Sequence, residues 1–196
     1  ILEGDRAVYS KTNPCALAGK YTLVLPGLPG DTFVPGGFSY GTVNIDSNGV
    51  VTLKGSLADK TTASQKGQIS RNGEWPLYVS LYSNKGSLLS WIRFEDRDGD
   101  DFNGLLNWAK PANPKNKLYP LGFTTNLAEV VGARYTVPAK TNKVIELTSS
   151  ELVLTGGNLP TTYTNAFNLG VGSKVTNAGP HKLTLTFTPA TGLFKG

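Results

Sequence analysis

The chain has 196 residues, of which 39% are hydrophobic and 17% charged, and it is long enough to bury the core of one large or two small domains. Its net charge of +5 comes from 19 lysines and arginines scattered along the chain, which excludes the concentrated basic face of a nucleic-acid-binding protein. Because no run approaches the roughly 18 apolar residues that a transmembrane helix needs, we predict no membrane span.

The composition predicts an all-β protein. The sequence contains 23 glycines and 12 prolines but no methionine, and few of its residues are strong helix formers. Many turn-forming residues between short apolar runs are typical of antiparallel strands joined by tight turns.

The first half of the chain predicts an antiparallel meander. Residues 20–25 form an expected strand that ends at a Pro-Gly pair. Residues 40–57 predict a hairpin, because apolar and polar residues alternate on both sides of Asn48-Gly49, a pair that supplies the positive φ angles of a tight turn. Residues 61–70 alternate weakly and are polar, which indicates an edge strand.

A second hairpin is predicted at residues 75–94, with its turn at 84–86, and a strand at 102–108 follows. Together these segments would give seven or eight strands, enough for an antiparallel β-barrel or sandwich formed by residues 1–110.

Residues 111–120, which are rich in Pro, Asn and Lys, predict a connection or a subdomain boundary. Further strands are expected in residues 121–196, at 134–138, 143–147 and 152–154 and in the strongly alternating segment 182–188. We expect these strands to pack on the first unit or to complete it.

The groups able to run acid–base or nucleophilic chemistry are few. The sequence has one histidine, His181, and one cysteine, Cys15, and no Gly-x-Ser-x-Gly motif surrounds a serine. One His and one Cys also make a zinc site implausible. We therefore expect a non-enzymatic protein, with Cys15 a buried or half-buried thiol.

Carboxylates gather in one segment, which gives two alternatives. Asp96, Asp98 and Asp100 alternate around a predicted turn, and Asp101 and Asn103 supply further oxygen atoms, the ligand type that Ca²⁺ prefers. The spacing departs from that of an EF-hand loop, because the glycine comes two positions too early. The alternative is a charged hairpin turn, and the cofactor expectation is therefore none or Ca²⁺.

Four aromatic residues offer a candidate ligand surface. Trp75, Trp91, Tyr78 and Tyr82 lie in or beside the second predicted hairpin, where exposed rings would stack on sugars and buried rings would fill the core. Tyr78 and Tyr82 share a parity opposite to that of the apolar residues on their strand, which makes them the best pair for an exposed aromatic face.

Several segments resemble β-rich modules of very large secreted bacterial proteins, in which such modules accompany immunoglobulin-like and other repeat domains. The resemblance rests on residues 19–27 (GKYTLVLPG), 40–46 (YGTVNID), 49–59 (GVVTLKGSLAD), 75–82 (WPLYVSLY), 86–91 (GSLLSW) and 189–196 (PATGLFKG). It implies an extracellular location and no established activity, and its motifs are strand and turn patterns without a catalytic signature.

From these features we predict a non-enzymatic structural or adhesive module of a larger secreted or cell-surface protein. The expected partners are neighbouring modules or identical subunits that bind through exposed strand edges. The alternative is a carbohydrate-binding module of a secreted hydrolase, with a polysaccharide as partner. The start at residues 1–3 without methionine fits either a processed piece of a longer protein or a trimmed one.

Overall fold

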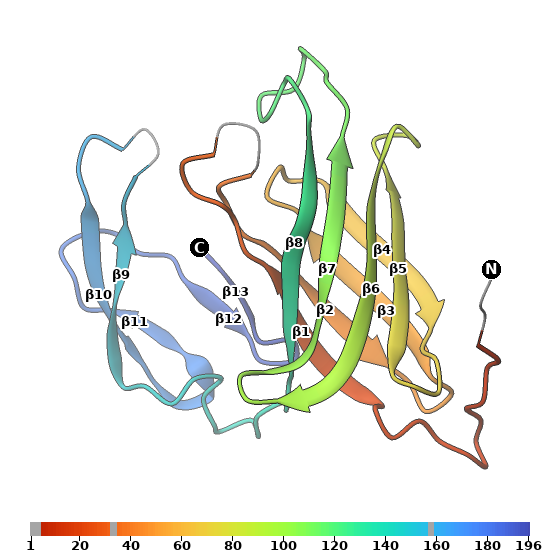
Figure 1. The fold of residues 1–196 in the computed structure, drawn as a ribbon. Coiled ribbons are helices and arrows are strands. Elements are labelled where there is room, and N and C mark those ends of the chain that lie inside the picture. Colours follow the sequence, from red (N-terminus) through yellow and green to blue (C-terminus); the bar gives the residue numbers. More distant parts are fainter. Residues whose placement is uncertain (1–4, 32–34, 157–158) are drawn as a thin grey trace. The chain divides into compact units, whose positions relative to one another are not determined.

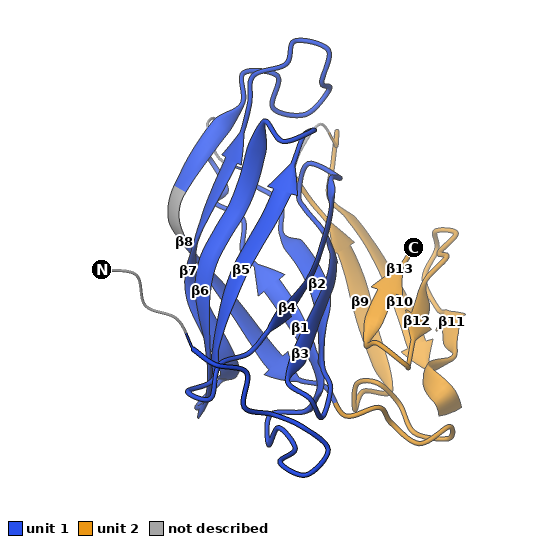
Figure 2. Cartoon of the chain, turned by 90° about the vertical axis from the view of Figure 1, so that its right-hand side faces the viewer, with its two compact units in different colours: residues 1–135 blue, residues 136–196 orange. Residues whose placement is uncertain are grey.

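The computed structural model describes residues 5–31, 35–156 and 159–196. Residues 1–3, on which the expectation of a longer parent protein rests, lie outside the described residues. The described part divides into two compact units, residues 1–135 and 136–196 (Figure 2).

Unit 1 is one antiparallel sheet of eight strands in the order β4-β3-β2-β1-β8-β7-β6-β5, curved into a nearly closed barrel (Figure 1). Its strands are β1 (Gly19–Leu25), β2 (Ser39–Ile45), β3 (Val50–Ser56), β4 (Thr62–Gln68), β5 (Glu74–Leu81), β6 (Gly86–Arg97), β7 (Asp100–Lys110) and β8 (Phe123–Arg134). The all-β fold predicted from the sequence is confirmed, and the barrel is the form that it takes.

Both predicted hairpins are present. β2 pairs with β3 around a turn in which Gly49 has φ +73°, and β5 pairs with β6 around residues 82–85. β4, expected at an edge, stands at one end of the strand order. β8 pairs with both β7 and β1 and so joins the two halves of the meander into one sheet.

Alternation along the strands builds the core. On β5 every second side chain is buried, and the same pattern runs along β2 and most of β6. Trp75, Trp108, Phe102 and Tyr21 are the largest fully buried side chains, and the Tyr21 ring meets those of Phe94 and Phe102 edge to face. Cys15 is buried in this core, as the sequence predicted.

Residues 111–122 form the loop between β7 and β8, and the first compact unit continues through β8 to Tyr135. The division therefore falls at 135/136, whereas the sequence analysis placed the connection at 111–120. Proline and asparagine mark that segment as a loop, but a loop between neighbouring strands of one sheet has the same composition as a linker.

Unit 2 holds a sheet of three short strands and a separate hairpin. Its elements are β9 (Ser149–Leu154), β10 (Tyr163–Leu169), the 3₁₀ turn η1 (Val171–Ser173), β11 (Val175–Asn177), β12 (Thr186–Thr188) and β13 (Leu193–Lys195). The strands expected at 134–138 and 143–147 are wrong, and only the end of segment 182–188 is a strand. Of these three segments, only Arg134, the last residue of β8, and Thr186–Thr188 pair with another strand.

Candidate functional site

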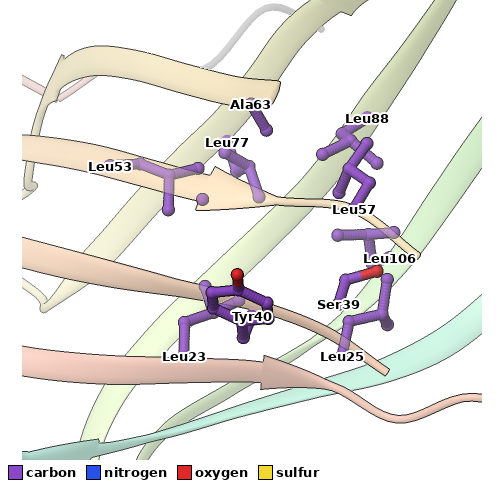
Figure 3. A pocket seen from close by; sticks show the side chains of 11 residues that line it. Leu23, Leu25, Ser39, Tyr40, Leu53, Leu57, Ala63, Leu77, Leu88 and Leu106 are labelled. Atoms are coloured by element: carbon purple, nitrogen blue, oxygen red, sulfur yellow. The ribbon is translucent and has the colours of Figure 1, made fainter. Parts of the chain in front are cut away.

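The barrel interior is filled by side chains. It holds an apolar cavity of about 20 Å³, lined mainly by inward-facing leucines of β1, β3, β5, β6 and β7 (Figure 3). That is room for roughly one water molecule, whereas pockets for small ligands measure hundreds of Å³. A binding surface of unit 1 must therefore be sought on the outside of the sheet or at its ends.

An apolar patch lies on the outer face of β5, β6 and β7. It consists of Tyr78, Leu89, Trp91 and Leu105, which are exposed by 57%, 50%, 68% and 52%. The register places Tyr78 directly opposite Leu89 and Trp91 directly opposite Leu105, so the four side chains are adjacent on three strands. We call this set the outer patch.

Two of the four aromatic residues singled out by sequence are in the outer patch, and two are not. Trp75 is fully buried, and its indole belongs to the core. Tyr82 lies beyond the end of β5 in the turn, with φ +53°, so strand parity does not apply to it. The structure therefore does not bring Tyr78 and Tyr82 together on one face, and Trp91 is the exposed ring nearest in register to Tyr78.

Tyr82 instead joins a buried polar network at one end of the barrel. Lys110 Nζ lies 2.7 Å from Asp59 Oδ2, and the two side chains are only 4% and 0% exposed. The Tyr82 hydroxyl donates to the same Oδ2 at 2.7 Å and accepts a hydrogen bond from Trp108 Nε1 at 3.1 Å. The Thr61 amide donates to Asp59 Oδ1 at 3.0 Å.

Burial and hydrogen bonding act on the two acids of this network in different ways. Burial raises the pKa of Asp59, but the hydrogen bonds from Lys110, Tyr82 and Thr61 outweigh it, so the net pKa of that carboxyl lies below its ordinary value. Burial and the neighbouring Asp59 carboxylate raise the pKa of the Tyr82 hydroxyl. Asp59 is thus held as an anion and Tyr82 as a neutral donor.

The network was not predicted from the sequence, because Lys110 directly precedes the Pro-, Asn- and Lys-rich segment 111–120 and was counted among the scattered basic residues. A signal was available: Leu106, Trp108 and Lys110 share one parity on a strand, and the first two are inward-facing apolar residues. A lysine that continues an inward-facing series is expected to be buried and therefore to have a partner.

The acidic segment forms the β6–β7 hairpin end. Asp101 Oδ2 accepts the backbone N–H of Arg134, and Asp100 accepts from the Asn103 amide. Across the residues that the structure describes, no three His, Cys, Asp or Glu side chains converge as metal ligands do. Calcium binding by Asp96, Asp98 and Asp100 stays a prediction.

His181 lies in unit 2, where its backbone N–H donates to Asn165 Oδ1 at 2.8 Å and its ring meets Tyr163 edge to face. Asn165 Nδ2 in turn donates to Asn177 Oδ1 at 2.6 Å. These contacts link β10, β11 and the loop that follows β11. The contacts of His181 therefore stabilise the fold of unit 2.

The comparisons with known proteins do not assign the chain to a family. No protein-family model, no curated protein and no solved structure matches the chain. Within the described residues, no helix has the length and hydrophobicity needed to cross a membrane.

Proposed function

We propose that this chain is a non-enzymatic structural or adhesive module of a larger secreted or cell-surface protein, and that the outer patch is its adhesive surface. The sequence supports the non-enzymatic part, since it offers one histidine and one cysteine for chemistry. The filled barrel interior supports a role for the outer surface, because the cavity among the inward-facing leucines has room for roughly one water molecule.

The observation that carries the proposal is the continuity of the outer patch. Exposed apolar side chains on a monomeric protein are normally scattered one at a time, and adjacent ones mark interaction surfaces. Trp91, Tyr78 and their leucine neighbours form such a set, with Trp and Tyr the residue types most enriched at binding hot spots. Arg93 and Glu95 on β6 give it a charged border.

We take an identical subunit as the partner, because an apolar patch can pack against the same patch of a second copy. The charges beside it on β6 already pair within the chain, Arg93 and Arg97 with Glu95. Sedimentation velocity over a range of concentrations tests this. The wild-type chain is expected to dimerise, and Trp91→Ser with Leu105→Ser is expected to stay monomeric. Leu121→Ser is the matched control, because Leu121 is 81% exposed in the β7–β8 loop.

The outer patch is not the dimer interface if the wild type is monomeric. The same holds if the dimer persists in the Trp91 and Leu105 variant.

The second possible route of assembly is through exposed strand edges. In unit 1 the end strands β4 and β5 are bridged to one another by side chains. In unit 2, β9 ends the sheet order, with Val153 and Leu154 about half exposed.

Strand addition at β9 is therefore the second assembly route that we propose. Val153→Lys places a charge on that edge, a substitution that natural edge strands use to prevent pairing. Loss of association in Val153→Lys but not in the outer-patch variant would assign assembly to unit 2, and the reverse would assign it to unit 1.

The second candidate function is carbohydrate binding, and one observation favours it: Tyr78 and Trp91 expose their rings on neighbouring strands of the same face. Such rings stack on the apolar faces of sugars. A pull-down with insoluble polysaccharides is expected to retain the wild type and to lose Tyr78→Ala and Trp91→Ala. Phe38→Ala, an exposed aromatic change outside the outer patch, is the control.

A further inference from the structure

We propose that Lys110 and Asp59 join covalently, in an intramolecular amide bond between Lys110 Nζ and Asp59 Cγ. The proposal is independent of the outer patch. It starts from the geometry of the buried network, in which a primary amine and a carboxyl group are held in direct contact and away from water.

The two reacting atoms are close. Nζ lies 2.7 Å from Oδ2. Because Oδ2 is bonded to Cγ, Nζ is within roughly 4 Å of the carbon that it attacks, near the separation of a reactive ground state. The two residues come from different places in the sheet, since Lys110 ends β7 and Asp59 lies in the turn between β3 and β4. Folding, and not sequence proximity, brings them together.

The surrounding side chains fix the direction of each hydrogen bond. The Trp108 indole can only donate, so the Tyr82 oxygen must accept from it, and the Tyr82 proton is left for Asp59. Lys110 Nζ also lies 4.3 Å from the centre of the Tyr82 ring. Tyr82 therefore touches both the amine and the carboxyl oxygen that has to leave.

The reaction begins with a proton transfer. One proton moves from the Lys110 ammonium to Asp59 Oδ2, which gives a neutral amine and a carboxylic acid. This transfer is unfavourable in water. Inside the barrel the hydrogen bonds that keep Asp59 ionised oppose it, whereas burial, which penalises both charged groups, favours it.

The amine nitrogen then attacks Cγ, forming the N–C bond while an electron pair moves onto Oδ1. The Thr61 amide, 3.0 Å from Oδ1, is placed to stabilise that negative charge. Tyr82 gives its proton to Oδ2 and takes one from the nitrogen, the Cγ–Oδ2 bond breaks, and Oδ2 leaves as water. One ammonium and one carboxylate become one amide and one water, without any oxidant, reductant or co-reactant.

Mass spectrometry of the full chain tests the proposal. The denatured wild-type protein is expected to weigh one water molecule less than its sequence. Trypsin is expected to release residues 55–60 joined to residues 98–115, because it cuts after Lys60, Arg97 and Lys115 but not between Lys110 and Pro111. The full sequence mass, with these two peptides separate, would overturn the proposal.

Variants exclude other dehydrations. Lys110→Met lacks the nucleophile and is expected to show its full mass, a readout that does not require the variant to fold. Lys54→Met, an exposed lysine on β3, is expected to keep the loss of water. A loss that persists in Lys110→Met, such as cyclisation at Asp98-Gly99, would count against the bond. Tyr82→Phe tests the proton relay, and linkage at the wild-type rate during refolding would remove Tyr82 from the mechanism.

Discussion

The indole Nε1 of Trp75 on β5 donates a hydrogen bond to Oε1 of Gln65 on β4, across 2.9 Å. These are the two end strands of the eight-strand order, so the bond links the first and last strands of the barrel. Gln65 Nε2 adds a second bridge by donating to the Pro76 carbonyl at 3.0 Å. Pro76 has no N–H to donate and takes part in this bridge through its carbonyl, which accepts from the Gln65 side chain.

Gln65→Leu is therefore expected to destabilise unit 1 by about 1–3 kcal/mol, because the Trp75 indole is buried and loses its acceptor. Chemical denaturation followed by tryptophan fluorescence measures this. Lys66→Leu, on the exposed side of the same strand, controls for the loss of polarity. Equal stability of the two variants would show that the bridge does not hold the barrel closed.

Gly132→Ala is expected to be among the most disruptive single-methyl changes in unit 1. Gly132 pairs with Phe102 across β7 and β8, and a Cβ at position 132 would collide with the Phe102 ring. Phe102 is fully buried between other rings and has no room to yield, so a cost of about 1–3 kcal/mol follows. Gly67→Ala is the matched control, because a Cβ there has only ordinary contacts at 3.5 Å.

Stability is expected to fall as the pH rises above about 10, the ordinary pKa of tyrosine. Burial raises the pKa of both Tyr82 and Tyr21, so the folded state keeps protons that the unfolded state releases. Stability from these groups is complete below the ordinary pKa and is lost above it. Urea denaturation across pH 8–11 is expected to show a shallower fall of the free energy of unfolding with pH for Tyr82→Phe than for the wild type, and an equal slope would contradict this prediction.

Asp101→Ala is expected to cost about 0.5–1.5 kcal/mol with or without calcium, since the Arg134 amide loses its acceptor at the start of the β8–β1 pairing. Asp98→Ala, in the exposed part of the hairpin end, is expected to leave the stability in a chelator unchanged. Thermal melts with CaCl₂ and with EDTA measure both. A calcium-dependent rise in Tm that Asp98→Ala abolishes would establish the predicted calcium site.

Local features of the sequence predicted the local features of the fold. The hairpin around Asn48-Gly49 and the alternation on β5 depend on neighbouring residues, and both are present. The pairing of β8 with β1 joins residues far apart in the chain, and no short sequence pattern encodes it. The bridge between Trp75 and Gln65 depends likewise on the curvature that brings the end strands β4 and β5 together. The alternation in segment 182–188 also predicted a longer strand than the structure has, because only Thr186–Thr188 pairs with another strand.

The residues of the candidate site could likewise be predicted from the sequence only in part. Apolar residues stand at both odd and even positions around Trp91, at Leu88, Leu89 and Ile92, so alternation alone does not tell which face of the strand is buried. The exposure of the Trp91 ring follows from which face of β6 packs inward. The buried network depended on the fate of Lys110, at a strand end where a lysine is usually solvated. The position of Asp59 opposite it, in the turn between β3 and β4, comes from the curvature of the sheet.

Alternation divides the side chains of β5 into two sets with separate tasks, and the same holds for most of β6. The inward set fills the barrel and carries the stability, while Tyr78, Leu89, Trp91 and Leu105 have half or more of their surface in solvent. Replacing the outward set opens no void, since those side chains are not part of the packed interior. The outer face of these strands is accordingly a suitable place for a combinatorial library, from which new affinities could be selected on an unchanged scaffold.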